Sequence, residues 1–587
     1  MSEGSQLNQT LPTLSPGNVV TIGARLFSLN GGNYFVTSLL AHLWLYLGFF
    51  GAALGLGVMA AIAFAAADNN PAVTAGVIGL GALVMLPLFA FVWGRYLASG
   101  ALISRLVFNF LTHQEESLET TRSQVYPNVW CYFWASVWQG LILLLVYAGI
   151  AGSLYVLWIS LFPLFTAFSL NRLWESGDTD VSAFVWTSLF LLAMLLLLAI
   201  FLVIYYVTSR LWFCDAILAL ENQVGPLESV QRSWQITRNQ GFNAMTVLFV
   251  GTIVTTPPTI MASLLNTFVP VVGILMGVVV FPFWQAAKAV HYYELRRRNE
   301  GLSFDFEALP ARPRQYLRRV ALKTPESIEL DFALGGLGSR SLAWITDQTL
   351  LFLSLALVWL LGSALYAYVV VPAVVDGPSS IALDDLNLWV FAIASLLTYA
   401  FSNGYYIAFE TFWQGQTPGK RWAKIRVIQD SGQLVGLREA AIRSLIGPLD
   451  LGFFFLGVVL VAFGKSEKRL GDFAAGTLVV QDEKRQGVRQ PTVQLRFGER
   501  SQTTAQTLVQ EANLKALTAD QYLTLRDFLG YRTQLEPAIR KKVTVGLASQ
   551  LRQIIAPPES VAALNFMDEE LLEATYLACR DTIYKQA

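Results

Sequence analysis

Uninterrupted apolar runs constrain this chain more than any other feature of its sequence. Several exceed the roughly 20 residues that an α-helix needs to cross a bilayer. Hydrophobic residues make up 54% of the chain and charged residues 14%, whereas a soluble globular protein carries about 25% charged residues. The mean hydropathy of +0.49 agrees, so we expect an all-α polytopic membrane protein rather than a soluble enzyme. The predicted spans lie at about 35–66, 73–98, 129–163, 184–208, 243–264, 270–290, 341–371 and 387–412.

A shorter apolar segment, at about 449–464, lies between two basic stretches. Basic residues collect in cytoplasmic loops of membrane proteins, so both flanks of this segment are expected on the same side. We therefore interpret it as re-entrant or interfacial and not as a ninth span. The same rule predicts that both termini and the basic linker at 296–334 are cytoplasmic. We expect a bacterial plasma (inner) membrane, or a thylakoid membrane in a cyanobacterium.

The composition along the chain predicts five segments. The first is polar and rich in Pro, Gly and Ser, which is typical of disorder and unlike a cleavable signal. The predicted segments are a disordered leader at 1–20, a six-helix membrane module at 21–295, a basic linker at 296–334, a second membrane module at 335–487 and a soluble helical domain at 488–587.

The last segment has ordinary charge density and helical periodicity. Thr518 and Gln521 form a capping box before a helix with an apolar face. This helical domain either packs as a small bundle against its own membrane domain or docks a cytoplasmic protein partner.

Charge and residue chemistry exclude several functions. Lys+Arg and Asp+Glu both number 41, so no net field favours nucleic acid as a partner. The 3 cysteines and 3 histidines are scattered along the chain, without the spacing of a metal site or a disulfide framework. We find no nucleophile elbow and no cofactor fingerprint. We therefore expect no enzyme, no cofactor and no metal, with the lipid bilayer as the main partner.

The second membrane module holds the most informative polar residues. Arg340 lies at the mouth of a predicted helix and Asp347 lies two turns deeper, a rise of about 10 Å. That separation is too long for a close ion pair along one helix, so Asp347 needs another partner or a proton. An ionisable group in a membrane helix indicates a functional site by default. The alternative is an aspartate that hydrogen-bonds neighbouring helices and fixes their packing.

Two further motifs follow in the same module. Glu410 precedes the sequence Gly-Gln-Thr-Pro-Gly-Lys at 415–420, which lacks the spacing of a phosphate-binding loop. We interpret it as a turn followed by a short strand ending near 432. The last motif, Arg-Leu-Gly-Asp followed by Ala-Gly-Thr-Leu-Val-Val, spans 469–480.

The three motifs in this order resemble the RDD family over roughly 335–482. The resemblance implies that Arg340, Asp347 and Asp472 are the arginine and the two aspartates that name the family. It also implies a membrane module that transports a small ligand or exchanges cations and protons. The candidate site residues are Arg340, Asp347, Asp472, Glu410, Gly415, Gly419 and Lys420.

Two functions remain open. In a secondary transporter, Asp347 would bind a proton or cation, Arg340 would gate or orient it, and Asp472 would sit at the entrance. In a scaffold or assembly factor, the membrane modules would hold protein partners or lipids without transport.

The first membrane module is less specific. The phrase from Ala219 to Trp234 resembles the six-helix membrane domain of some glycerophosphodiester phosphodiesterases, but their catalytic barrel is absent from the sequence. Three amphipathic stretches, each before an apolar hairpin, suggest a weak internal repeat or a chance similarity. We expect Lys288 to extend its amine toward a membrane surface. Arg210 and Asp215 are close enough to pair.

Overall fold

Helices make up almost all of the molecule, as expected from the apolar runs. Among the described residues, 8 helices are long and apolar enough to cross a membrane, which confirms the all-α polytopic fold. The structure, a computed structural model, describes residues 14–66, 71–112, 114, 116–167, 179–221, 223–301, 316–323, 329–370, 383–452, 456–482, 493, 495–535, 537–555 and 566–582.

The chain divides into two compact units. The N-terminal unit comprises residues 30–248 and 277–300, and the C-terminal unit comprises residues 1–29, 249–276 and 301–587.

In the N-terminal unit, pairs of long apolar helices are separated by short helices. Its helices are α2 (Gly31–Ala66), α3 (Pro71–Leu111), α4 (Leu118–Val125), η1 (Tyr126–Asn128), α5 (Val129–Ala167), α7 (Thr179–Leu211), α8 (Cys214–Leu220) and α9 (Pro226–Ile236). Helix α10 (Gly241–Asn266) begins in this unit and continues in the C-terminal unit, and α11 (Val271–Glu300) belongs to this unit from residue 277 onward. A short helix precedes each pair of long helices, and α1 (Pro16–Leu29) of the other unit precedes α2 in the same way. This order is the one that the weak sequence repeat predicts.

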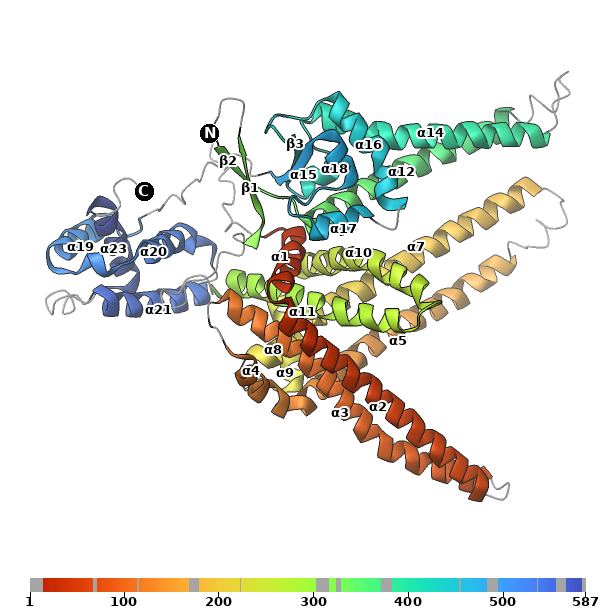
Figure 1. The fold of residues 1–587 in the computed structure, drawn as a ribbon, viewed down its shortest axis with the longest axis horizontal. Helices are drawn as coiled ribbons and strands as arrows, with labels where there is room; N and C mark the ends of the chain where they lie inside the picture. Colours follow the sequence, from red (N-terminus) through yellow and green to blue (C-terminus); the bar gives the residue numbers. More distant parts are fainter. Residues whose placement is uncertain are drawn as a thin grey trace. The chain divides into compact units, whose positions relative to one another are not determined.

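The C-terminal unit contains two candidate spans that carry a small polar head. Short helices and strands gather at one end of α12 (Leu337–Leu365) and α14 (Leu383–Phe412), as Figure 1 shows. We call residues 413–452 and 456–482 the head. Its elements are α15 (Pro418–Trp422), β3 (Ile425–Gln429), α16 (Leu437–Gly452), α17 (Leu456–Phe463), α18 (Leu470–Ala475) and β4 (Thr477–Gln481), while the π-helical turn η3 (Tyr366–Val370) ends α12.

Two antiparallel strand pairs support the head. The strand predicted after the 415–420 turn is β3, and it pairs with β4. A second hairpin, β1 (Arg319–Lys323) with β2 (Glu329–Ala333), lies inside the predicted linker. Leu334 bridges to Val480, and Leu322, Leu334, Ile428, Leu478 and Val480 form one buried apolar cluster. The described part of the linker is therefore folded against the head and is not an open connection.

The structure corrects the C-terminal end of the predicted disordered leader. Helix α1 begins at Pro16, so residues 16–20 are helical, while residues 1–13 lie outside the described residues. Its Thr21 hydroxyl accepts a hydrogen bond from Gly338 N (3.1 Å) at the start of α12. A Cβ on Gly17 would lie 2.6 Å from Ser339 Cα, so only glycine permits this approach of the two backbones.

The short apolar segment forms two helices rather than one span. Helix α16 ends at Gly452, and α17 has 8 residues, a length of about 12 Å. That is too short to cross a bilayer of about 30 Å. Its interpretation as re-entrant or interfacial stays a prediction.

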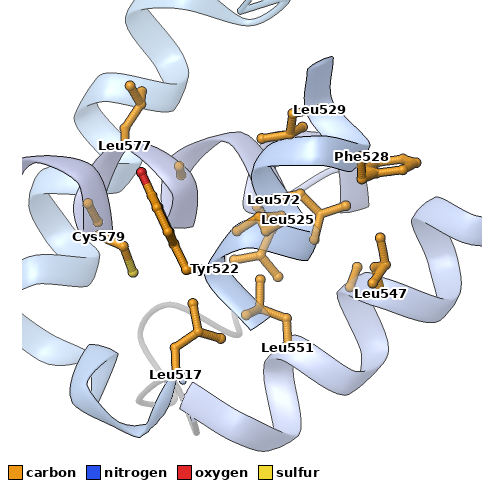
Figure 2. Packing of buried hydrophobic residues seen from close by; sticks show 14 of the residues in the cluster. Leu517, Tyr522, Leu525, Phe528, Leu529, Leu547, Leu551, Leu572, Leu577 and Cys579 are labelled. Atoms are coloured by element: carbon orange, nitrogen blue, oxygen red, sulfur yellow. The ribbon is translucent and has the colours of Figure 1, made fainter. Parts of the chain in front are cut away.

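The C-terminal helices enclose an apolar core. Thr518 and Gln521 form the expected capping box at the start of α20, and Leu525 and Phe528 are fully buried behind it. Figure 2 shows these side chains converging with residues of the neighbouring helices. The helices are α19 (Gly498–Glu511), η4 (Leu514–Ala516), α20 (Ala519–Tyr531), η5 (Arg532–Gln534), α21 (Pro537–Ile555) and α23 (Asp568–Thr582).

Candidate functional site

Asp347 of α12 lies in a cradle of neutral hydrogen-bond donors. The residue is 1% exposed. Its Oδ1 accepts hydrogen bonds from the Tyr405 hydroxyl (2.8 Å) and from Gly419 N (2.8 Å), and its Oδ2 accepts one from the Thr417 hydroxyl (2.6 Å). Neither Arg340 nor any other cation in the described part of the chain forms an ion pair with this carboxylate.

The 415–420 turn brings two of these donors to α12. Thr417 is the N-cap of α15 and also accepts a hydrogen bond from Lys420 N (3.2 Å). A Cβ on Gly419 would lie 2.1 Å from Ala343 O, so a glycine is needed for its N–H to reach Asp347. Gly415 has a left-handed φ of +83° and contacts the backbone of Val427 rather than Asp347. Gly415 is therefore a structural residue of the turn.

Arg340 pairs with the other aspartate of the family motif. Its Nη1 donates to Asp472 Oδ2 (2.7 Å), and its remaining nitrogens donate to the carbonyls of Gly335 (2.7 Å) and Glu467 (2.5 Å). Asp472 is 0% exposed and also accepts a bond from Arg469 N (3.1 Å). These contacts tie the start of α12 to α18.

Arg443 of α16 links Asp472 to Glu410. One of its nitrogens donates to Asp472 Oδ1 and to the Thr477 hydroxyl (2.8 Å), and Nε donates to Glu410 Oε2 (3.2 Å). Glu410 in turn pairs with Lys420. Arg340, Asp472, Arg443, Glu410 and Lys420 therefore form one continuous network, which we call the ion network.

Burial and charge pairing act in opposite directions on the ion network. Burial would raise the pKa of Asp472, but Arg443, Arg340 and Arg469 outweigh that effect and hold the pKa well below its usual range. Burial lowers the pKa of the Lys420 amine, and the nearby Glu410 opposes this shift only in part.

Two further carboxyls border the ion network. Asp450 and Glu467 are each less than one-tenth exposed, and one oxygen of each has no hydrogen-bond partner among the described residues. Burial raises the pKa of both carboxyls, although Arg469 opposes the shift at Asp450 and Arg340 opposes it at Glu467. At both carboxyls, the effect of burial on the pKa therefore outweighs the effect of the nearby arginines.

The structure assigns the predicted residues to two adjoining places. Asp347 and Gly419 belong to the donor cradle, whereas Arg340, Asp472, Glu410 and Lys420 belong to the ion network. The turn at 417–420 connects them because Lys420 and Thr417 belong to the same short segment.

Sequence reasoning missed several members of the site. Arg443 lies in one of the basic stretches beside the 449–464 segment and was not among the candidate residues, and neither were the neutral partners of Asp347, Tyr405 and Thr417. The two buried carboxylates of the ion network need a cation nearby. That need was the one signal in the sequence that could have pointed to a basic residue on a neighbouring helix. Among the described residues, no group of three or more His, Cys, Asp or Glu could hold a metal ion.

Comparison with known proteins agrees with the motif order. Residues 334–476 match the RDD family. A search of curated proteins gave no match, and a search of solved structures gave none either. Residues 334–476, which hold the donor cradle and the ion network, are thus the part of this chain that is similar to the RDD family.

Proposed function

We propose that this chain is a secondary transporter in which Asp347 exchanges a proton or a small monovalent cation, coupled to movement of a small ligand. One observation carries the proposal. Asp347 is a buried carboxylate whose partners are all neutral donors, while Arg340 and Arg443 pair with Asp472 and Glu410. A proton or a bound cation would supply the compensating charge that the site lacks.

The geometry also supports a means of coupling. A protonated carboxyl becomes a donor at one oxygen, so at Oδ2 the bond with the Thr417 hydroxyl would have to reverse its direction, and without the negative charge Oδ1 is a weaker acceptor for Gly419 N. The contacts from Thr417 and Gly419 would then weaken, and these residues adjoin Lys420, which pairs with Glu410. Charge uptake at Asp347 would thus loosen the 417–420 turn from α12 and disturb the ion network. No catalytic step is part of this proposal.

The test compares Asp347→Asn with wild type in two measurements. Asparagine keeps the shape of the side chain but cannot exchange a proton. We expect proton- or cation-driven flux into liposomes to disappear, scanned with Na⁺, K⁺, Li⁺ and H⁺ gradients. We expect stability in detergent to fall by only about 1–2 kcal/mol, because hydroxyl donors can rotate and accept from the amide. A matched control is Asp430→Asn in the head, where the carboxylate is 47% exposed and paired with Lys468.

Unchanged flux in Asp347→Asn, or no flux in wild type, would contradict the proposal. Asp347 would then be a packing residue, and the scaffold function would be better supported than transport. In that case a stoichiometric protein partner should co-purify from gently solubilised membranes, with the C-terminal helical domain as the proposed docking part. The proposed location is a bacterial plasma membrane with both termini cytoplasmic.

A further inference from the structure

One face of α11 in the N-terminal unit carries polar contacts along most of its length. Val278 O accepts a hydrogen bond from the Ser38 hydroxyl (2.7 Å). Gln285 accepts bonds from the Ser104 hydroxyl (3.2 and 3.1 Å). Further along, the Tyr292 hydroxyl donates to Glu221 (2.5 Å). Positions three or four residues apart share a helix face, and the contacts fall at 278, 285, 288, 292 and 296.

We call this face the polar stripe. From residue 278 to residue 296 it rises about 27 Å, from within the predicted span at 270–290 to the start of the predicted basic linker. Gln285 and Tyr292 are 8% and 0% exposed, so the stripe faces protein and not lipid. Buried polar residues along a membrane helix mark ion or proton pathways, although they also stabilise packing between helices.

An ion pair lies in the middle of the stripe. Lys288 Nζ is 2.6 Å from Asp215 Oδ2 and 2.9 Å from Oδ1, and the two side chains are 6% and 16% exposed. The expectation that Lys288 extends toward a membrane surface is therefore wrong. Asp215 does not pair with Arg210, whose guanidinium donates to Trp234 O (2.6 Å) and the Thr237 hydroxyl (3.2 Å).

Other titratable groups surround this pair. Tyr132 of α5 and Cys214 of α8 interact electrostatically with Asp215. His291 lies one turn from Lys288 on α11, is 0% exposed, and has no hydrogen-bond partner for either ring nitrogen among the described residues. A buried polar group without a partner calls for an explanation such as a functional role.

We propose that the Lys288–Asp215 pair is a proton-exchanging site of the N-terminal unit. The proton moves from Lys288 Nζ to Asp215 Oδ2, which turns the ammonium and carboxylate into an amine and a carboxylic acid. This step removes both charges from a pair whose side chains are 6% and 16% exposed. Asp215 then releases this proton to water and the Lys288 amine takes another proton from water, which restores the ion pair. This site goes beyond the exchange proposed for Asp347.

The decisive variant is Lys288→Arg in the full chain. A guanidinium keeps the ion pair but does not deprotonate in proteins, so stability should stay near wild type while proton exchange stops. The measurement is acidification of liposomes loaded with a pH-sensitive dye, driven by a potassium diffusion potential. We expect the proton flux to fall at least tenfold, and the melting temperature in detergent to change little.

A second variant tests whether a loss of flux in Lys288→Arg comes only from the larger arginine side chain disturbing the packing. The double change Asp215→Asn with Lys288→Gln removes both charges together and leaves no unpaired ion. It should also lose the flux, while a matched pair outside the stripe, Arg105→Gln with Glu116→Gln, should keep it. Arg105 and Glu116 pair at 2.8 Å in the same unit.

The outcomes separate this site from Asp347. Wild-type flux in Lys288→Arg or in the double variant overturns the inference and leaves a structural ion pair. Wild-type protein that moves protons no faster than empty liposomes also overturns it. Loss of flux in Asp347→Asn with normal flux in Lys288→Arg would support the proposed function and reject this site. The reverse result would support this site and reject the role of Asp347.

Discussion

Asp347 and Asp472 are two buried aspartates of one module, 1% and 0% exposed, held by opposite means. Arginines surround Asp472, whereas hydroxyls and a backbone amide surround Asp347. A carboxylate among cations keeps its charge over the whole physiological range, because protonation would leave the cations unpaired. A carboxylate among neutral donors can change its charge without leaving another charge exposed. The comparison separates an anion held by cations, which organises the head, from an anion held by neutral donors, at which we propose exchange.

The largest expected effect comes from Asp472→Asn. This change leaves Arg340 and Arg443 buried with a neutral amide in place of their shared carboxylate. Removing one partner of a buried ion pair typically costs about 3–5 kcal/mol, so we expect a loss of that size in thermal unfolding in detergent. A loss no greater than that of Asp347→Asn would remove the distinction between the two aspartates.

Arg443→Lys should have the next largest effect. A lysine carries the same charge but cannot contact Asp472, Thr477 and Glu410 with the separate nitrogens that the arginine uses. We expect a loss of about 2 kcal/mol in the free energy of unfolding. Chemical denaturation of the solubilised protein measures it, and a neutral outcome would show that charge alone holds the ion network.

Tyr405→Phe and Thr417→Val each remove one donor from Asp347. A hydrogen bond to a charged group contributes about 1.5–3 kcal/mol at most, and the other donors remain, so we expect about 1 kcal/mol for each variant. Chemical denaturation of the solubilised protein measures the loss. Unchanged stability in both variants would show that these donors do not hold the Asp347 side chain.

The smallest effect should be a stabilisation by Asp450→Asn. Burial raises the pKa of this carboxyl, so the folded state binds its proton more tightly than the unfolded state and becomes less stable as pH rises. Removing the charge should therefore stabilise the protein slightly at pH 8, measured by thermal unfolding in detergent, and the gain should vanish below about pH 4, where both states are protonated. The contribution of Asp472 to stability changes with pH in the opposite direction. Its pKa is lowered, so its contribution is complete above about pH 4 and is lost as pH falls further.

Much of this architecture was predictable because membrane helices obey simple rules of length and composition. The spans and the order of the motifs could be read along the chain. The separation of Arg340 from Asp347 followed from helix geometry alone. The hairpin β1–β2 could not be predicted, because its pairing with the head depends on Leu322 and Leu334 meeting distant residues such as Val480.

The partners of the site were harder to predict for a similar reason. Tyr405 and Thr417 are neutral and lie 58 and 70 residues from Asp347, so no local pattern marks them as its donors. Lys288 was misjudged because its position near a helix end suggested exposure. Its counter-ion belongs to another helix, α8, and only the tertiary fold brings the two together.

The position of Asp347 along α12 determines how a membrane voltage would act on it. From Gln348 to Leu365 the helix continues for about 27 Å, nearly the whole hydrocarbon thickness. Leu350, Phe352 and Leu353 at the start of this stretch are exposed. If α12 crosses the membrane with this stretch, Asp347 would lie near one end of the electric field and not at its middle. A charge that crosses the whole field gains about 2.3 kcal/mol per 100 mV, but an ion that reaches Asp347 from the nearer side would gain only a small part of this.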